Sequence, residues 1–148
     1  MKEITKIMIK DFKIMKLGVD FMGYEVDRKE NLSFHHLVIP HRCCKEQGLG
    51  EGYYYWNGAI LMQRNSHEYL HIIEQKDRDV FDYITSEMII MNCLGKLTSE
   101  NLKKINEALI SFEKEHCSDK GSKGRYLIKE EYIRGRRRWK KYLKMFVI

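Results

Sequence analysis

The succession of strand, loop and strand patterns over residues 32–62 limits the folds open to this chain more than any other feature. Residues 32–39 are rich in β-branched and aromatic side chains, which predicts a strand, and Pro40 ends it. Residues 41–56 hold three glycines without any periodicity and predict a long irregular loop. Residues 58–62 predict the return strand. The segment should therefore form a two-stranded hairpin closed by a long loop.

A helix is predicted directly after this hairpin. Ser66 is suited to cap its N-terminus, and the helix should run from residue 67 to about residue 75. Asn57, where the loop re-enters the second strand, is placed to bind the loop backbone with its side-chain amide. The sequence therefore predicts a compact unit of two strands and one helix.

Five of the six histidines fall inside this unit, in positions that suit a metal site. Neighbouring side chains of a strand point to opposite faces, so His35 and His36 cannot share one role. Residues four apart on a helix share a face, so His67 and His71 can bind one ion together. The predicted ion lies between His35 and this helical pair, with His36 beside it as a candidate general base. His41, in the loop, has no partner in this pattern.

These residues resemble the motif of the HNH endonucleases. The core of that family, the ββα-metal or His-Me finger core, runs His-His-x-x-Pro, then Asn, then a helix with one or two metal-binding histidines. The matching residues of this chain are His35, His36, Pro40, Asn57, His67 and His71. The resemblance covers about residues 30–75, at most half of the chain. Its His-x-x-x-His ending is most similar to the nuclease-colicin variant.

The resemblance implies an activity and a role for each matching residue. It implies phosphodiester hydrolysis, with His36 activating water, Asn57 fixing the loop, and His35, His67 and His71 ligating the metal. Pro40 stands one position later than in the family, and the spacing from Asn57 to the helical histidines is one residue longer than the commonest pattern. The chain has no C-x-x-C pair, so the structural zinc of many family members is not expected.

One divalent metal ion is the expected cofactor. Three imidazole ligands suit Zn²⁺, Ni²⁺ or Mn²⁺ better than Mg²⁺, which prefers oxygen, but no motif selects among the four ions. A histidine near its ordinary pKa of ~6.5 is well matched to taking a proton from water at neutral pH. A histidine pair in a strand is often packing, and a lone His-x-x-x-His is often coincidence. A core retained only as a scaffold therefore stays open.

Helices are predicted on both sides of the core. Residues 2–16 place apolar side chains at helical spacing before Gly18. A second helix should begin at Asp77 or Asp79 and end before Gly95, and a third should span residues 98–116. The expected fold class is thus α+β: a ββα-metal core with added N-terminal and C-terminal helices.

The length of 148 residues favours one domain over the whole chain. Within it we expect the core at about 30–75, a helical part at 77–116 and a basic C-terminal segment at 118–148. No apolar run approaches the ~20 residues that span a bilayer, so no membrane partner is expected. The N-terminus lacks the features of a secretory signal. The cysteines are Cys43, Cys44, Cys93 and Cys117, and they predict reduced thiols and a cytoplasmic protein.

The positive charge of the chain lies in its C-terminal segment. Residues 118–148 hold eleven Lys and Arg against three acidic residues, a net of +8 in a chain whose total is +6. This asymmetry points to a polyanionic partner, which we expect to be DNA. The residues predicted to contact nucleic acid are Arg42, Arg134, Arg136, Arg137, Arg138, Lys140 and Lys141. The alternative is a terminal helix that docks by its interleaved aromatics and leaves a solvated basic face.

The leading interpretation is a small metal-dependent DNA endonuclease of phage or mobile-element type. A catalytically inactive HNH-like regulator that binds DNA or protein stays open, and so does a metal-stabilised structural protein. The sequence leaves the oligomeric state open, a homodimer included. It also does not encode sequence specificity or the choice between nicking and double-strand cleavage.

Overall fold

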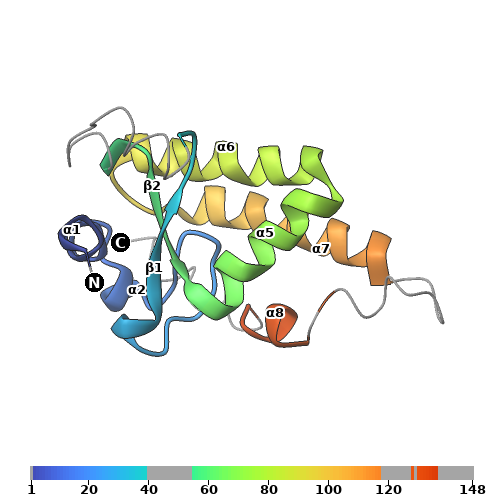
Figure 1. Ribbon diagram of the computed structural model, residues 1–148, viewed down its shortest axis with the longest axis horizontal. Coiled ribbons are helices and arrows are strands. Elements are labelled where there is room, and N and C mark those ends of the chain that lie inside the picture. The colour runs from blue at the N-terminus through green and yellow to red at the C-terminus, as the bar shows by residue number, and fades with distance from the viewer. Residues whose placement is uncertain (1, 40–54, 118–127, 129, 137–148) are drawn as a thin grey trace.

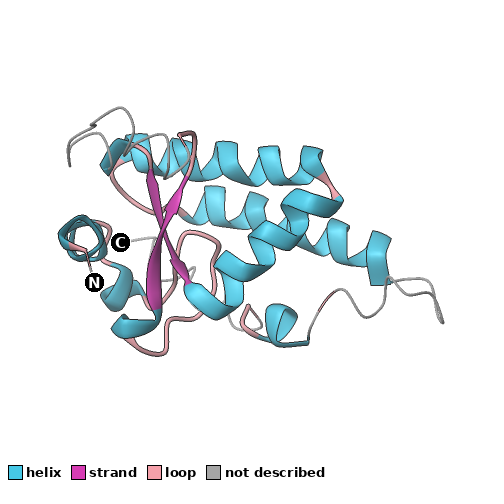
Figure 2. Ribbon diagram, viewed as in Figure 1, coloured by secondary structure: helices cyan, strands magenta, loops and turns pink. Residues whose placement is uncertain are grey.

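The computed structural model describes residues 2–39, 55–117, 128 and 130–136, which form a mixed, helix-rich α+β structure (Figure 1, Figure 2). The elements in chain order are α1 (Glu3–Asp11), α2 (Ile14–Leu17), η1 (Lys29–Asn31), β1 (Leu32–His36), β2 (Gly58–Met62), η2 (Gln63–His67), α5 (Glu68–Lys76), α6 (Arg78–Leu94), α7 (Ser99–Cys117) and α8 (Glu130–Arg134). The expected α+β class is confirmed. None of the helices in these ranges has both the length and the apolar character needed to cross a membrane.

The two strands form the predicted antiparallel hairpin. Leu32 lies opposite Met62 at one end, and His36 lies opposite Gly58 at the other. The ring of Phe34 packs directly over Gly58, where an added Cβ would lie 2.3 Å from the ring and force it to move. All five residues of β2 are buried, so the core covers both faces of this strand.

The first strand is shorter than predicted. It ends at His36 rather than at residue 39 because the next backbone amides bond elsewhere. The amide groups of Val38 and Ile39 donate to the side-chain oxygen of Asn57, at 2.8 and 2.9 Å. An amide used in this way cannot extend the ladder with β2.

Helices α5, α6 and α7 cover the hairpin with a shared core. Figure 1 shows α5 leading away from β2, with α6 and α7 side by side next to it. The side chains that the hairpin and these helices bury together include Ile60, Leu61, Leu70, Ile73, Ile84, Met88, Ile105 and Leu109. Each such side chain stabilises the fold by about 1.5–3 kcal/mol through burial. The core therefore holds α5 rigidly against the strands.

The predicted boundaries of the two long helices are confirmed to within one residue. The Asp77 carboxylate accepts from the Val80 amide at 3.2 Å and caps α6. Gly95 ends α6 in the left-handed conformation, with φ of 74°. Thr98 precedes α7, and its hydroxyl accepts from the Asn101 amide at 3.1 Å.

The single helix predicted over residues 2–16 is wrong. The chain breaks after α1, where Lys13 adopts a left-handed φ of 55°. The break buries Phe12, whose ring centroid lies 4.9 Å from that of Phe21, and it also lets Ile14 enter the core. A straight helix would not direct both side chains inward. Gly18 ends α2 as predicted.

Ser66 does not cap a helix, contrary to the sequence prediction. It is buried inside the π-helical turn η2, and its hydroxyl donates to the carboxylate of Asp20. Helix α5 then continues from η2 without a side-chain cap at His67. The competing hydrogen bond to Asp20 determines the conformation here, and π turns of this kind often lie at functional sites.

The described part of the C-terminal segment includes the short helix α8, which packs into the core. Tyr132 of α8 is fully buried and stacks on Tyr69 of α5, with ring centroids 4.8 Å apart and planes 6° from parallel. Glu25 donates its backbone amide to the carbonyl of Gly135 at 3.0 Å. For Tyr132, the docking alternative holds, because a buried ring cannot stack on a base.

Candidate metal centre

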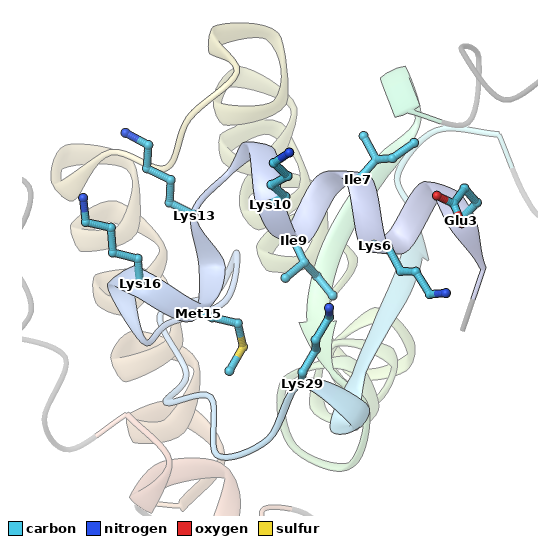
Figure 3. Close-up of a pocket in the computed structure, with 9 residues that line it drawn as sticks. All are labelled: Glu3, Lys6, Ile7, Ile9, Lys10, Lys13, Met15, Lys16 and Lys29. Carbon is cyan, nitrogen blue, oxygen red and sulfur yellow. The ribbon is translucent and has the colours of Figure 1, made fainter.

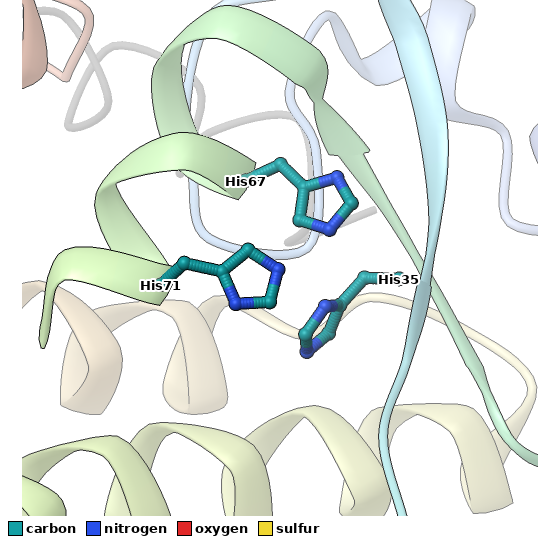
Figure 4. A group of neighbouring side chains, drawn as sticks. All are labelled: His35, His67 and His71. Atoms are coloured by element: carbon teal, nitrogen blue, oxygen red, sulfur yellow. The ribbon is translucent and has the colours of Figure 1, made fainter. Parts of the chain in front are cut away.

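Three histidines converge from the hairpin and the helix that follows it. His35 lies on β1, His67 ends η2, and His71 lies one turn further along α5 (Figure 4). Ring centroids are 5.0 Å apart for His35 and His67, 5.6 Å for His35 and His71, and 5.0 Å for His67 and His71. One ligand nitrogen from each ring lies within 4.8 Å of the others. The structure thus brings together the three ligands expected from the sequence.

The distances fit one small metal ion. Zinc binds imidazole nitrogen at about 2.0–2.1 Å, so two nitrogens on one ion lie at most about 4.2 Å apart. In a tetrahedral site two such nitrogens stand about 3.4 Å apart. The nitrogens here lie within 4.8 Å of one another, so the rings need to approach by at most about 1.4 Å, which side-chain rotation supplies. The donor set of three imidazoles also suits a transition metal.

Hydrogen bonds orient two of these rings. Nδ1 of His67 lies 2.8 Å from the hydroxyl oxygen of Ser33, which itself donates to the Leu61 carbonyl at 3.1 Å. The Ser33 oxygen therefore accepts from His67, and Nε2 keeps a free lone pair. Nδ1 of His71 lies 3.3 Å from the Glu74 carboxylate, which favours the same tautomer.

The third ring carries a buried nitrogen that suits a metal ligand. His35 is 4% exposed, and its Nε2 has no hydrogen-bond partner among the described residues. An orphaned polar atom of this kind costs free energy unless something binds it. A metal ion between His35 and the helical pair would satisfy it.

The electrostatic environment keeps the imidazoles of His35 and His67 neutral at neutral pH. Burial, reinforced by the neighbouring histidines, lowers the pKa of His35 to about 3. Burial and the nearby rings of His71 and His36 lower the pKa of His67 to about 4. A neutral imidazole has the lone pair that a metal needs, so His35 and His67 are in the form that a metal ion requires.

His36 lies on the other face of β1, as strand alternation predicts. Its ring meets the edge of Phe34, with centroids 4.9 Å apart. His36 lines a pocket of about 440 Å³ that His35, His67 and His71 also line. It also lines a second groove of about 430 Å³ on the side of α1. His36 therefore stands between the histidine cluster and the surface of the N-terminal helix.

Asn57 ties down the start of the loop. Its side-chain oxygen accepts from the amides of Val38 and Ile39, and its amide nitrogen donates to the Ile39 carbonyl at 2.6 Å. Its own carbonyl accepts from the Leu37 amide at 2.8 Å. The backbone directly after His36 is thus fixed by Asn57, in agreement with the expected contact.

The structure describes two of the arginines predicted to contact nucleic acid, one exposed and one buried. Arg134 is exposed and pairs with Glu130 at 3.6 Å. Arg136 is only 4% exposed and binds the Glu113 carboxylate at 2.6 Å, so it serves the core and we withdraw it as a DNA contact. The remaining predicted contacts lie outside the described residues: Arg42, Arg137, Arg138, Lys140 and Lys141.

Sequence reasoning missed the residues that support the histidines. Ser33 stands two positions before His35 on the same strand face, and Glu74 stands three positions after His71 on the helix. Both spacings place the two side chains on the same face of their element, so the sequence could have predicted these contacts. Asp20 gave no such signal, because it acts on Ser66 from 46 positions away.

A second group of metal-binding side chains lies away from this centre. Asp77, Glu115 and His116 each offer a ligand atom within 4.8 Å of the others. Asp77 already caps α6, and the His116 ring packs on Phe112 with centroids 4.3 Å apart. These two histidine-containing groups are the candidate metal sites within the described part of the chain.

The chain was compared with protein-family models, with curated proteins and with solved structures, and none of these comparisons gives a match.

Proposed function

We propose that the chain is a metal-dependent DNA endonuclease whose β1, β2 and α5 form a ββα-metal core similar to that of the HNH family. The observation that carries the proposal is the convergence of His35, His67 and His71, with His36 on the adjoining face of the same strand. This is a ligand set with a candidate base beside it. The positive charge of the chain supports a polyanionic substrate.

Each residue of the site has one role in the proposed reaction. A bound divalent ion would neutralise the phosphate and stabilise the leaving oxygen. His36 takes the proton from the attacking water and releases it to solvent after cleavage. Asn57 is a positioning residue, since it fixes the backbone that follows His36. Ser33 and Glu74 hold the helical imidazoles in the ligand tautomer.

Cleavage of supercoiled plasmid tests the proposal. Purified protein should nick the plasmid with at least one of Mg²⁺, Mn²⁺, Ni²⁺ or Zn²⁺, and a chelator should stop the reaction. His36→Ala should lower turnover by ~10²–10⁴ while metal affinity stays nearly unchanged. His67→Ala or His71→Ala should lower both.

His116→Ala is the matched control, because it removes a histidine outside the site. It should cleave at the wild-type rate. Cleavage that persists in chelator, or that His36→Ala leaves intact, would show the proposed mechanism to be wrong. Binding of DNA without nicking under every metal would instead favour the inactive regulator.

A further inference from the structure

A groove lined with lysines lies on the N-terminal part of the molecule, away from the histidine cluster. It has a volume of about 630 Å³, and three separate segments contribute to it (Figure 3). The lysines that line it are Lys6, Lys10, Lys13, Lys16 and Lys29. Ile9 and Met15 lie between them, and Glu3 is the one acidic residue of the lining.

The five lysines give this groove a net positive charge, against which Glu3 is the one acidic residue of the lining. All five lysines are exposed, and within the described part of the chain none of them forms an ion pair. The left-handed backbone at Lys13 turns α2 back, so that Lys16 faces the same groove as α1. Like charges held together repel one another, and they create a field that attracts anions. The groove is therefore suited to a polyanion.

The lysine groove continues toward the candidate base. Lys6 and Lys10 are four residues apart and share one side of α1, and Lys2 is the residue directly before this helix. Lys2 lines the neighbouring groove together with His36, Thr5 and Gln63. Glu30 is the acidic residue of this neighbouring groove, and Lys2 places one positive charge between His36 and the lysines of α1.

The shape of the helix argues against a membrane surface as the partner. An interfacial helix inserts its apolar face into the lipid. The apolar face of α1 is buried instead, with Met8 fully buried and Ile4 and Ile9 less than 10% exposed. Ile7 and Met15, which also line the groove, are 36% and 44% exposed, but they lie on different elements, each among lysines. The groove therefore offers a partner mainly positive charge, which is the pattern of a phosphate-backbone contact.

We propose that the lysine groove binds the phosphodiester backbone of DNA that extends from the candidate catalytic site past His36. This inference rests on the proposed function for its choice of DNA as the polyanion. It assigns a nucleic-acid contact to α1, α2 and η1, which is independent of the basic C-terminal segment. No base is read there, because lysine contacts to phosphate carry no sequence information.

The test measures DNA binding in chelator, so that cleavage plays no part. A labelled DNA duplex is titrated with the full chain and with the variant Lys6→Gln/Lys10→Gln/Lys13→Gln/Lys16→Gln, at several salt concentrations. The matched control is Lys76→Gln/Lys96→Gln/Lys103→Gln/Lys114→Gln, which removes the same charge from exposed lysines outside the groove. Circular dichroism checks that each variant is folded.

The groove variant should weaken binding at least about 10-fold and reduce the slope of log K against log salt by about 2–4, since each lost phosphate contact removes ~0.9. The control variant should change the slope by less than 1. Equal losses in both variants would overturn the inference, because only net charge would then matter. Wild-type affinity in the groove variant would overturn it as well.

Vesicles of phosphatidylserine and phosphatidylcholine provide a further arm. Binding of the wild-type chain to these vesicles but not to DNA would overturn the inference in favour of a lipid surface. The plasmid assay keeps the two proposals separate. Groove-dependent DNA binding without cleavage under any metal would support the inference while the proposed function fails.

Discussion

The hydroxyl oxygen of Ser33 lies 2.8 Å from Nδ1 of His67, and this contact joins the first strand to the helical histidine pair. Ser33 in turn donates to the carbonyl of Leu61 on the partner strand. The hairpin therefore fixes the tautomer of a ligand that belongs to the next element. A strand residue thus acts on the candidate metal centre through the helical histidine pair.

Replacing this hydroxyl should weaken metal binding without unfolding the chain. In Ser33→Ala the His67 ring loses its acceptor, and loss of such a supporting contact typically costs 10–100-fold in metal affinity. Calorimetric titration with Zn²⁺ measures the change. Ser86→Ala is the control, because Ser86 is exposed and bonds only to the local carbonyl of Tyr83. Equal Zn²⁺ affinity in both variants would show that Ser33 does not support the histidine cluster.

Metal should stabilise the chain through the histidine cluster. Free Zn²⁺ at 100 times its Kd should raise the free energy of unfolding by about 2.7 kcal/mol, because only the folded state presents the three ligands. His35→Ala should abolish the rise in Tm, whereas His116→Ala should retain it. If the rise in Tm instead depends on His116, the ion binds at the group formed by Asp77, Glu115 and His116.

The sequence predicted the parts of the site that depend on local spacing. Alternation along a strand separated His35 from His36, and helical spacing paired His67 with His71, as the structure has them. Each of these contacts needs knowledge of one element only. The order of the two strands and the helix then brought the three ligands to one place.

The errors arose where distant residues decide the local conformation. The Asp20 carboxylate receives hydrogen bonds from Met62 and Ser66, 42 and 46 positions away, and so turns an expected cap into a π turn. The carboxylate of Glu113, 23 positions away in the sequence, binds the Arg136 guanidinium inside the core. The residues next to Ser66 and Arg136 in the sequence would be the same whether or not these distant partners existed. Local spacing therefore cannot tell a capping serine from a buried one, or an exposed arginine from a buried one.

Asp20 should make stability depend on pH in a defined direction. Burial raises the pKa of this carboxyl to about 6, against the opposing hydrogen bonds from Ser66 and three backbone amides. Because the folded chain binds the proton more tightly than the unfolded chain, stability is greatest below pH 3.8 and falls as the pH rises to about 6. The loss should be about 2–3 kcal/mol.

Urea unfolding of the wild-type chain and of Asp20→Asn, both in chelator, measures this dependence. The other ionisable groups are common to both proteins, so the difference between the two free energies isolates Asp20. The wild-type chain should lose stability relative to Asp20→Asn between pH 4 and pH 6. A difference that is flat or rises over this range would show that the carboxyl is ionised throughout.

Arg136 should matter for stability rather than for DNA binding. Its guanidinium binds the buried carboxylate of Glu113, which also accepts from the Tyr69 hydroxyl at 2.8 Å. Arg136→Ala leaves that carboxylate buried without its charge partner, which costs about 3–5 kcal/mol. Arg134→Ala removes an exposed arginine paired at 3.6 Å and should cost at most about 1 kcal/mol. Urea unfolding measures both losses. DNA affinity of the folded Arg136→Ala protein should equal that of the wild-type chain, and a weaker affinity at full folding would restore Arg136 to the nucleic-acid contacts.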